Sequence, residues 1–433
     1  MCSPVEVNFA RARVLFLLLF CGLPAPAQQG KKTSAPPATD AGQLVDLPGK
    51  PNNAHAMRQH YVVLVSLDGF RYDYPQEHGA QNIAALAKAG ATAPDGMLPS
   101  YPSLTFPNHW TLVTGLLPEH HGIVRNSFYD PARKETYSYK ESKTNTDGTW
   151  YSGTPLWSLA EQQGMRAASF FWPGSEAEVA GERPDDYVHF LDTLPDEQRI
   201  DQVITWLSLP PARRPHLITL YYSNTDHAGH NYGPDSAETR AAVQHVDTLM
   251  GELRGRLDAT GLPVDMVVLA DHGMVRIDPE WIQFDKFADL SHTRVQEWLL
   301  YPESEAEAEK VYEQFRQHPD PRFSVYRRKD VPAELHYSAS PRIGDPVIIP
   351  NGPYIAHLHA TDTRVNPGDH GYDPAALTSM RALFVANGPD IRAGVQLPVF
   401  PNVDVYSFIT RLLDLKPVAN DGELGPLKQA LKR

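Results

Sequence analysis

The fold of this 433-residue chain is decided by the stretch Tyr61-Val62-Val63-Leu64-Val65-Ser66-Leu67-Asp68-Gly69. Up to Leu67 the stretch is almost continuously apolar and rich in β-branched side chains, which is typical of a strand covered on both faces. Similar apolar runs follow at residues 167–172, 217–222 and 266–270, and another lies at residues 382–386. Together these runs predict a sheet buried in the interior of the protein.

Helical patterns lie between the apolar runs, at residues 82–89, 154–163 and most clearly 237–257. Asp235 and Glu238 resemble a capping box at the start of the last one. Buried strands that alternate with amphipathic helices predict an α/β fold with a parallel-rich central sheet and helices on both faces. In such sheets the ligand site lies beyond the carboxyl ends of the strands.

The beginning of the chain has the pattern of an export signal. Arg11 and Arg13 precede an apolar stretch over residues 14–23, which is followed by the small-residue pattern Ala25-Pro26-Ala27. The stretch is shorter than the roughly 20 residues that a membrane span needs. We therefore expect a signal peptide over residues 1–27, an exported protein (periplasmic or secreted), and no membrane span.

Composition divides the rest of the chain. Residues 28–60 are rich in Gly, Pro, Ala, Lys, Thr and Asn, which predicts a flexible leader before one main domain over residues 61–433. Residues from about 281 to 350 break the alternation of strands and helices, and residues 303–316 are charged and helical in pattern. This segment predicts a small α/β insertion in the main domain.

Charge and cysteine content exclude several classes of function. The formal net charge is −13 and no long basic run is present, so binding that coats a duplex nucleic acid is not expected. A metal can still supply positive charge locally for a single phosphate group. Both cysteines, Cys2 and Cys21, lie in the predicted signal peptide, so we expect no disulfide and no thiol chemistry in the mature chain. No protein partner can be inferred.

Carboxylates and histidines follow the predicted strands. The set consists of Asp68, Asp226, His227, His230, Asp271, His272 and, from a later Asp-His pair, His370. A single aspartate after a strand is more often a turn or helix cap than a ligand. Three at one sheet edge would repel one another without a cation, and aspartate with neutral imidazole suits zinc or manganese. The pattern therefore predicts a metal centre.

The segment Pro102-Ser103-Leu104-Thr105-Phe106-Pro107-Asn108-His109 supplies a second ingredient. Pro107 can occupy the first turn of a helix, and a hydroxyl at such a start stands beside free N–H groups that favour an anion. Thr105 or Ser103 could be only an N-cap. Beside metal ligands, however, the Thr105 hydroxyl would lose its proton easily and become a nucleophile.

In order and content, these motifs resemble the nucleotide pyrophosphatase/phosphodiesterase family of the alkaline phosphatase superfamily, from about Tyr61 to the end of the chain. The most specific pieces are Ser66-Leu67-Asp68-Gly69-Phe70-Arg71, Ser103-Leu104-Thr105-Phe106-Pro107-Asn108-His109, Trp172-Pro173-Gly174-Ser175, Asp226-His227-Ala228-Gly229-His230, Ala270-Asp271-His272-Gly273-Met274 and Gly368-Asp369-His370-Gly371-Tyr372. The resemblance implies an alkaline phosphatase-like fold and makes residues 61–433 a phosphodiesterase catalytic domain.

The resemblance also implies two Zn²⁺ ions and a covalent mechanism. One ion would be held by Asp68, Asp271, His272 and Thr105, and the other by Asp226, His230 and His370. His227 matches no ligand position. Thr105 would be the nucleophile in the cleavage of nucleotide phosphodiester and pyrophosphate bonds, with release of nucleoside 5′-monophosphates.

Substrate contacts follow from the same resemblance. Asn126 would steady a non-bridging phosphate oxygen, and Phe106 and Phe190 would sandwich a nucleobase. The family usually has tyrosine where Phe190 stands, and relatives often have aspartate where Glu176 stands. We therefore expect a nucleotide or another small phosphodiester as substrate.

Three alternatives stay open at this stage. A phosphomonoesterase of the same superfamily would need an extra cation at the phosphate. The neutral side chain of Asn126 at that position favours a diesterase, but the neighbouring cation of Arg125 weakens this argument. A lysophospholipid-type phosphodiesterase would use the same metal ligands. A non-catalytic binding protein that retains the fold would have no reason to keep so many candidate ligands.

Overall fold

The computed structural model describes residues 41–47, 49–278, 280–359 and 366–432. The expected signal peptide, residues 1–27, and the first part of the expected leader lie outside these ranges. Within the described ranges, no helix is both long enough and apolar enough to cross a membrane.

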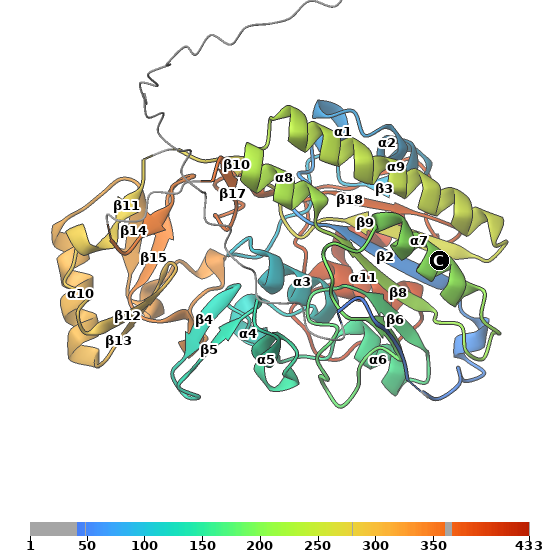
Figure 1. Cartoon of the computed structure of the whole chain (residues 1–433), viewed down its shortest axis with the longest axis horizontal. Coiled ribbons are helices and arrows are strands. Elements are labelled where there is room, and N and C mark those ends of the chain that lie inside the picture. The colour runs from blue at the N-terminus through green and yellow to red at the C-terminus, as the bar shows by residue number, and fades with distance from the viewer. Residues whose placement is uncertain (1–40, 48, 279, 360–365, 433) are drawn as a thin grey trace, which may run out of the picture. The chain divides into compact units, whose positions relative to one another are not determined.

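A nine-stranded sheet forms the centre of the fold (Figure 1). Its strands are β1 (Leu44–Asp46), β2 (Tyr61–Leu67), β3 (Ala91–Thr92), β6 (Ala167–Phe170), β7 (Asp186–Val188), β8 (Leu217–Tyr222), β9 (Val264–Leu269), β18 (Phe384–Asn387) and β19 (Val395–Gln396). Their spatial order is β1-β7-β6-β8-β2-β9-β18-β3-β19. From β7 to β9 all neighbours run parallel, whereas β1 and β18 pair antiparallel with β7 and β9.

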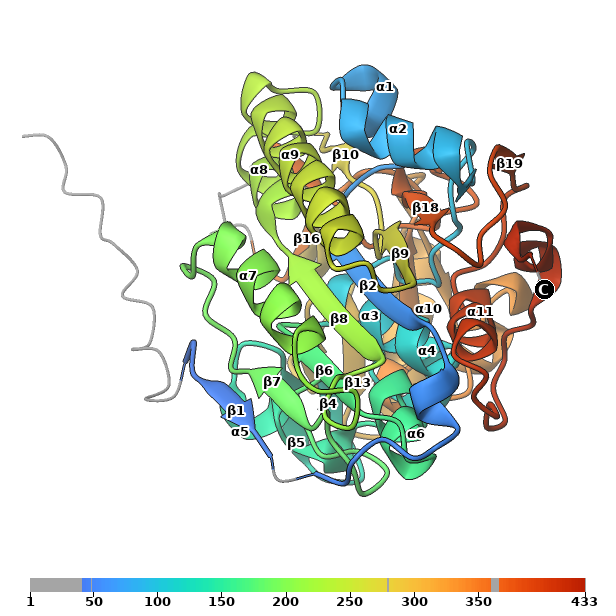
Figure 2. The ribbon, with the colours of Figure 1, turned by 90° about the vertical axis from the view of Figure 1, so that its right-hand side faces the viewer.

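Helices cover both faces of this sheet, as Figure 2 shows in the second view. The helices on one face are α2 (Gln81–Ala89), α7 (Asp196–Leu207) and α9 (Ala237–Ala259), and those on the other are α3 (Thr105–Thr114), α6 (Leu156–Gln162) and α11 (Asp404–Leu412). Val63, Leu64 and Val65 of β2 are fully buried because neither face meets water. The predicted α/β fold with a parallel-rich sheet is confirmed.

A smaller antiparallel sheet lies in the segment where we expected an insertion. Its order is β12-β13-β15-β14, and its elements are β12 (Thr293–Gln296), β13 (Leu299–Pro302), α10 (Glu305–Gln317), β14 (Phe323–Tyr326) and β15 (Val347–Pro350). Phe284, Val311 and Phe315 belong to a hydrophobic cluster separate from that of the main sheet. This part of the chain therefore has a core of its own.

Short elements complete the described fold. They are α1 (Tyr74–Glu77), α4 (Pro118–His121), β4 (Ser127–Asp130), β5 (Glu135–Ser138), α5 (Ser142–Asn145), α8 (Asn224–Tyr232), β10 (Val275–Arg276), β11 (Ile282–Gln283), β16 (Ala356–His357) and β17 (Gly368–Asp369). Of these, α8 and β17 carry residues of the candidate site.

We expected residues 28–60 to form a flexible leader, but the described part of this segment, from residue 41 on, is ordered against the main domain. Strand β1 pairs with β7 at the edge of the central sheet. The side chain of Asn52 donates to the backbone carbonyls of Pro211 (2.9 Å) and Arg214 (2.7 Å), and accepts from the backbone N–H of Arg166 at 2.7 Å. Polar composition concealed this order because the contacts use backbone and amide groups, which need no apolar run.

The N-cap of α9 is Ser236, not the Asp235 that the sequence pattern suggested. The Ser236 Oγ accepts from the backbone N–H of Thr239 at 3.0 Å, and the extended backbone of Ser236 is that of an N-cap. Asp235 instead lies 3.3 Å from the guanidinium of Arg276.

Helix α2 is capped by a side chain of α9. Asp247 accepts from the backbone N–H of Ile83 at 2.7 Å and from that of Asn82 at 3.1 Å, and Ala80 provides no side-chain cap. We predict that Asp247→Ala lowers the free energy of unfolding by about 2–3 kcal/mol, because two N–H groups lose a charged acceptor.

The measurement is urea denaturation followed by circular dichroism. Asp258→Ala is the matched control, since the Asp258 side chain is 68% exposed on the same helix. The control should stay within about 0.5 kcal/mol of the unsubstituted protein. Equal losses in the two variants would contradict the capping role.

Candidate active site

Three adjacent strands of the central sheet end in aspartates. Asp68 follows β2, Asp271 comes shortly after β9, and Asp226 lies in the first turn of α8, which follows β8. All three side chains are buried, with residue exposures of 1%, 0% and 8%. The carboxyl-end rule for parallel sheets therefore explains why residues far apart in sequence meet here.

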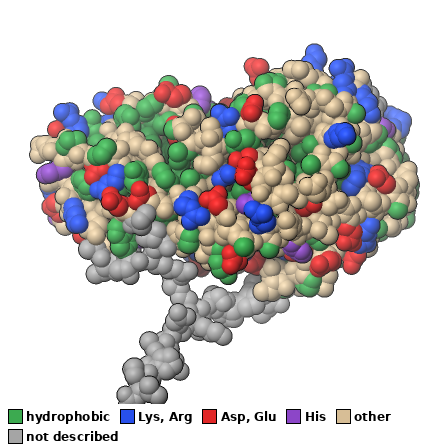
Figure 3. All heavy atoms as spheres, turned by 90° about the horizontal axis from the view of Figure 1, so that it is seen from above, with side chains coloured by type: hydrophobic (Ala, Val, Ile, Leu, Met, Phe, Trp, Pro, Cys, Tyr) green, Lys and Arg blue, Asp and Glu red, His purple; other side chains and the backbone are tan. Residues whose placement is uncertain are grey.

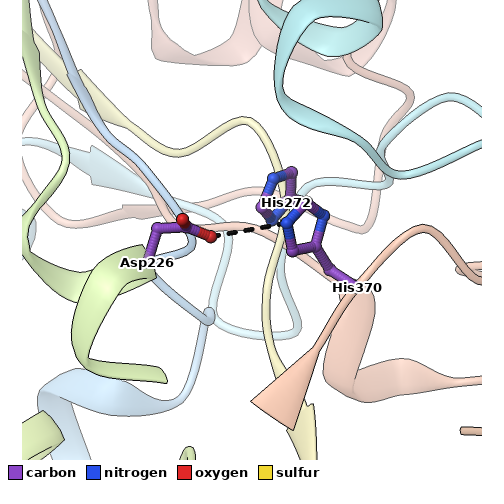
Figure 4. Close-up of side chains that lie close together, drawn as sticks. All are labelled: Asp226, His272 and His370. Carbon is purple, nitrogen blue, oxygen red and sulfur yellow. Dashed lines mark ion pairs between the residues drawn. The ribbon is translucent and has the colours of Figure 1, made fainter. Parts of the chain in front are cut away.

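Asp226 is joined by two histidines. His230 stands one helical turn after Asp226 on α8, so the two side chains share a face of the helix. His370 comes from the segment directly after β17. The Asp226 Oδ1 lies 3.4 Å from the Nε2 atoms of both His230 and His370. Figure 4 shows Asp226 and His370 pointing toward each other, with His272 beside them.

Asp68, Asp271 and His272 form the neighbouring group. The His272 Nε2 lies 2.9 Å from the Asp271 Oδ2 and 3.5 Å from the Asp68 Oδ1. The rings of His272 and His370 stack with centroids 3.6 Å apart. The two groups of expected ligands are therefore continuous, and Asp226, His272 and His370 themselves offer ligand atoms within 4.8 Å of one another.

The histidine rings are oriented by the backbone. Each directs its Nδ1 at a carbonyl oxygen: His230 at Gly368 (3.0 Å), His272 at Gly273 (2.9 Å) and His370 at Ser103 (2.9 Å). Because a carbonyl only accepts, each of these Nδ1 atoms carries a proton, which leaves the Nε2 atoms directed at the aspartates. Metal-binding histidines in proteins are commonly held in this way.

In the described part of the chain, one buried oxygen of each aspartate makes no hydrogen bond of good geometry: the Asp68 Oδ1, the Asp226 Oδ1 and the Asp271 Oδ2. The Nε2 atoms of His230 and His272 lie near these oxygens, at 2.9–3.5 Å. Buried carboxylate oxygens normally accept hydrogen bonds. Burial, and then the charges of Asp271 and Asp226, raise the pKa of Asp68 well above its usual range. Divalent cations would relieve this repulsion, so the residues present fit a metal centre.

The pKa values of two histidines move in opposite directions. Burial lowers the pKa of His370 to about 3, and the neighbouring charge of His272 adds to that effect. Burial also disfavours charge on His230, but the carboxylate of Asp226 overcomes it and raises the pKa of His230 to about 10. In the absence of metal a proton therefore resides between Asp226 and His230, and metal binding would release it.

Thr105 begins helix α3, and the cap residue before it is Leu104. Neither Thr105 nor Ser103 is the N-cap of α3, because Leu104 occupies that position and makes no side-chain hydrogen bond there. The Thr105 Oγ1 instead lies 3.4 Å from the Nε2 of His272. The hydroxyl expected to act as nucleophile is thus next to the aspartate and histidine cluster.

We expected the backbone N–H groups at the start of α3 to be free, but Asn126 accepts a hydrogen bond from one of them. Its Oδ1 accepts from the backbone N–H of Phe106 at 2.9 Å, and Pro107 has no N–H to offer. The helix start is therefore less rich in free donors than the sequence suggested. With its Oδ1 engaged, the Asn126 amide presents its Nδ2 as the donor.

A cavity of about 330 Å³ connects these groups, and it is also lined by Phe106 and Phe190. Phe190 is 46% exposed and packs edge-on against Phe171, with ring centroids 5.1 Å apart. Glu176 fixes the backbone beneath this ring, because its Oε1 accepts from the backbone N–H of Phe190 at 3.0 Å. His227 also lines the cavity, but it is exposed and lies 3.6 Å from Asp192.

Sequence reasoning missed two supporting side chains. Tyr221 donates its hydroxyl to the Asp68 Oδ2 at 2.6 Å, and nothing in the sequence pattern of its strand indicates this contact. His109 is fully buried and bonds the Thr105 carbonyl through Nδ1 and the Ser66 hydroxyl through Nε2, each at 2.8 Å. Because both ring nitrogens are engaged, His109 orients its neighbours. Its position four residues after Thr105 in the expected helix was the available signal.

The loop of Thr105 is connected to the loop of His370. The Ser103 Oγ donates to the carbonyl of Tyr372 at 2.7 Å and accepts from the N–H of Gly371 at 3.2 Å. Asp369, which we had not singled out, lies 3.8 Å from the Nδ1 of His230. These contacts join the candidate nucleophile and one candidate ligand through the backbone.

The central sheet is alkaline phosphatase-like, and it carries buried aspartates and histidines beside a threonine at the start of a helix. This combination of fold and site is typical of the metallo-phosphoesterase class. The family model described as type I phosphodiesterase/nucleotide pyrophosphatase matches residues 62–373. The chain belongs to this family.

Relatives from animals and yeast align with most of the chain. Human ectonucleotide pyrophosphatase/phosphodiesterase family member 1 is 35% identical over 391 residues, which cover 86% of this chain and 42% of the human protein. An uncharacterised pyrophosphatase/phosphodiesterase of Schizosaccharomyces pombe is 36% identical over 396 residues, covering 86% and 81%. A venom phosphodiesterase of Macrovipera lebetinus is 35% identical, covering 86% and 45%. The chain thus spans less than half of the human and viper relatives.

Solved structures of similar proteins share the fold. Mouse ectonucleotide pyrophosphatase/phosphodiesterase 5, as an inactive threonine-to-alanine variant in complex with AMP, superposes with a TM-score of 0.81 at 27% identity, covering 87% of this chain and 100% of that chain. The human counterpart gives a TM-score of 0.81 at 28% identity, covering 86% and 100%.

We predict that Asp68→Asn does not lower stability without metal but reduces the stabilisation that metal provides. In chelator-treated protein the melting temperature should rise or stay unchanged, because the substitution removes a carboxylate that burial and two like charges disfavour. With excess Zn²⁺ the unsubstituted protein should gain about 2.7 kcal/mol at a hundred times the dissociation constant, and the variant should gain less.

Thermal unfolding with chelator and with Zn²⁺ measures both effects. Asp192→Asn is the matched control, because Asp192 lines the same cavity but its side chain is 42% exposed and lies outside the cluster. If Asp68→Asn and the control respond equally to Zn²⁺, the carboxylate of Asp68 is not a ligand.

Proposed function

We propose that this protein is a zinc-dependent hydrolase that cleaves nucleotide phosphodiester and pyrophosphate bonds and releases nucleoside 5′-monophosphates. The observation that carries the proposal is that one cavity combines a hydroxyl, the aspartate and histidine cluster, an amide donor and two aromatic rings. Its lining includes Asp68, Thr105, Phe106, Asn126, Phe190, Asp226, His230 and His370.

The metal ligands of the proposal form two sets. Asp68, Asp271 and His272 with Thr105 would hold one Zn²⁺, and Asp226, His230 and His370 would hold the other. Bound there, the ions supply Lewis acidity that lowers the pKa of a hydroxyl group and neutralises charge on the phosphate. The unpartnered carboxylate oxygens and the directed Nε2 atoms support this assignment.

Thr105 carries the covalent step of the proposal. Its Oγ1 gives up a proton to solvent and forms a bond to phosphorus, while the bond from phosphorus to the leaving oxygen breaks and that oxygen departs with the electron pair and takes a proton from water. Water then attacks the threonine-bound nucleotide, which restores the hydroxyl and releases the monophosphate. The position of Thr105 at the start of α3 keeps the hydroxyl beside His272.

Asn126, Phe106 and Phe190 bind and orient the substrate. The Nδ2 of Asn126 donates to a non-bridging phosphate oxygen, and its orientation is fixed by the bond between its Oδ1 and the N–H of Phe106. The two phenyl rings stack on the nucleobase, and each base–aromatic contact of this kind contributes about 1–3 kcal/mol.

A diester is favoured over a monoester by the surroundings of Arg125. This residue follows directly before Asn126 and is buried, but its Nε donates to the Oε2 of Glu297 in the insertion at 2.9 Å. Its charge is thereby compensated and is not free to balance the second charge of a monoester. A nitrophenyl phosphate monoester should therefore be a poorer substrate than a nucleotide diester.

Export and partners complete the proposal. The human relative is named an ectonucleotide pyrophosphatase/phosphodiesterase and the viper relative a venom phosphodiesterase. With the expected signal peptide, these names support an exported protein with a catalytic domain over residues 61–433. The substrate is a nucleotide or another small phosphodiester. In Figure 3, acidic and basic side chains are interspersed on the face seen, which fits local phosphate binding rather than duplex binding.

We predict that Thr105→Ala lowers kcat/KM on a chromogenic nucleotide diester by at least about 1,000-fold, because the nucleophile is lost. Metal content should stay at the level of the unsubstituted protein, because Asp68, Asp271 and His272 remain to hold the ion that Thr105 also contacts. Thr105→Ser is the matched variant, and it should retain measurable activity because it keeps a hydroxyl. Full activity of Thr105→Ala would refute the nucleophile, and absence of bound metal in active protein would refute the metal centre.

We predict that Phe190→Ala raises KM for a nucleotide diester about 5- to 100-fold with little change in kcat, since stacking is lost. The KM for a diester without a nucleobase should not change. Tyr232→Ala is the control, because Tyr232 is also an exposed aromatic residue, at 54%, but does not line the cavity. An unchanged KM in Phe190→Ala, with glycerophospholipid cleaved faster than ATP, would favour the lysophospholipid alternative.

A further inference from the structure

A second cluster of side chains that can bind a metal lies at the amino ends of the parallel strands of the central sheet. His60 directly precedes β2, Asp265 is the second residue of β9, and Asp390 follows β18. These positions adjoin the amino ends of β2 and β9, whereas Asp68 and Asp271 follow their carboxyl ends. The cluster is therefore separate from the candidate active site.

The three side chains converge. The His60 Nδ1 lies 2.7 Å from the Asp390 Oδ2, and the Asp265 Oδ1 accepts from the backbone N–H of Asp390 at 3.0 Å. One nitrogen of His60 and one oxygen each of Asp265 and Asp390 lie within 4.8 Å of one another. The geometry thus provides one imidazole and two carboxylates around a common point.

Asp265 gives the independent indication of a ligand. It is fully buried, and its Oδ2 has no hydrogen-bond partner within the described ranges. The nearby ammonium of Lys432 donates to the carbonyl of Pro389 at 2.7 Å. A buried carboxylate beside a second carboxylate is stabilised by nearby positive charge, and a divalent cation can serve both.

We propose that His60, Asp265 and Asp390 bind one divalent cation of the zinc and manganese class, distinct from the catalytic ions. Imidazole nitrogen and carboxylate oxygen are ligands that suit these metals, and water can complete the coordination. A cavity of about 210 Å³ reaches Asp390 from the surface and is also lined by Gln59, Arg411, Leu412, Asp414 and Leu431.

The bound ion would connect three segments. Asp390 is tied to the carboxyl-terminal segment, because its carbonyl accepts from the backbone N–H of Lys432 at 2.8 Å. An ion on His60, Asp265 and Asp390 therefore fastens that segment to the beginnings of β2 and β9. Its role is structural, and activity at low temperature should not depend on it.

The test is the metal content of the full chain after dialysis against Zn²⁺ or Mn²⁺ and removal of weakly bound ion. Asp265→Asn should bind one molar equivalent less than the unsubstituted protein, with unchanged initial activity. Asp414→Asn is the matched control, since Asp414 lines the same cavity but is no candidate ligand, and it should retain the equivalent. Equal metal content in all three proteins would overturn the proposal and leave protons as the balancing charge.

Two further measurements test the site even if Asp265→Asn does not fold. His60→Ala changes a side chain that is 29% exposed, and it should lose the same equivalent and the metal-dependent rise in melting temperature. Anomalous diffraction from Mn²⁺-soaked crystals of the unsubstituted protein should give a peak among the three residues. Absence of that peak, with peaks at the catalytic ligands, would refute this site while leaving the proposed function intact.

Discussion

The repulsion among three buried aspartates at one sheet edge is the constraint on which the rest of the site depends. Asp68, Asp226 and Asp271 are placed by strands and a helix whose positions are fixed by core packing, so they cannot move apart without disturbing the sheet. The repulsion lowers the stability of the metal-free protein, but the proposed cation site is already formed in it. Folding of the sheet and the proposed binding of cations are consequently coupled thermodynamically.

The histidines show how the fold limits the freedom of that site. His230, His272 and His370 come from different segments, yet each is oriented by a backbone carbonyl rather than by another mobile side chain. A ring held in this way has little freedom to turn when a ligand binds. Asp68 is held in a similar way, because Tyr221 donates to its Oδ2 and leaves the Oδ1 without a hydrogen bond in the described part of the chain.

Much of this arrangement could be predicted from the sequence because it obeys simple periodicities. The continuous apolar run at Tyr61–Leu67 identified a strand covered on both faces, and the carboxyl-end rule brought Asp68, Asp226 and Asp271 together. Contacts made by backbone and isolated polar groups leave no such pattern. Strand β1, the cap at Ser236 and the roles of Tyr221 and His109 were missed or misassigned for that reason.

The connection between the Ser103 loop and the His370 loop has a mechanical consequence. Ser103 bonds Gly371 and Tyr372 with its side chain and His370 with its carbonyl, while Thr105 lies two residues further along the same loop. The proposed nucleophile and one proposed metal ligand are therefore held by two loops that are hydrogen-bonded to each other. The separation between the Thr105 hydroxyl and the His370 ring is thereby set by these local hydrogen bonds and not by more distant loops.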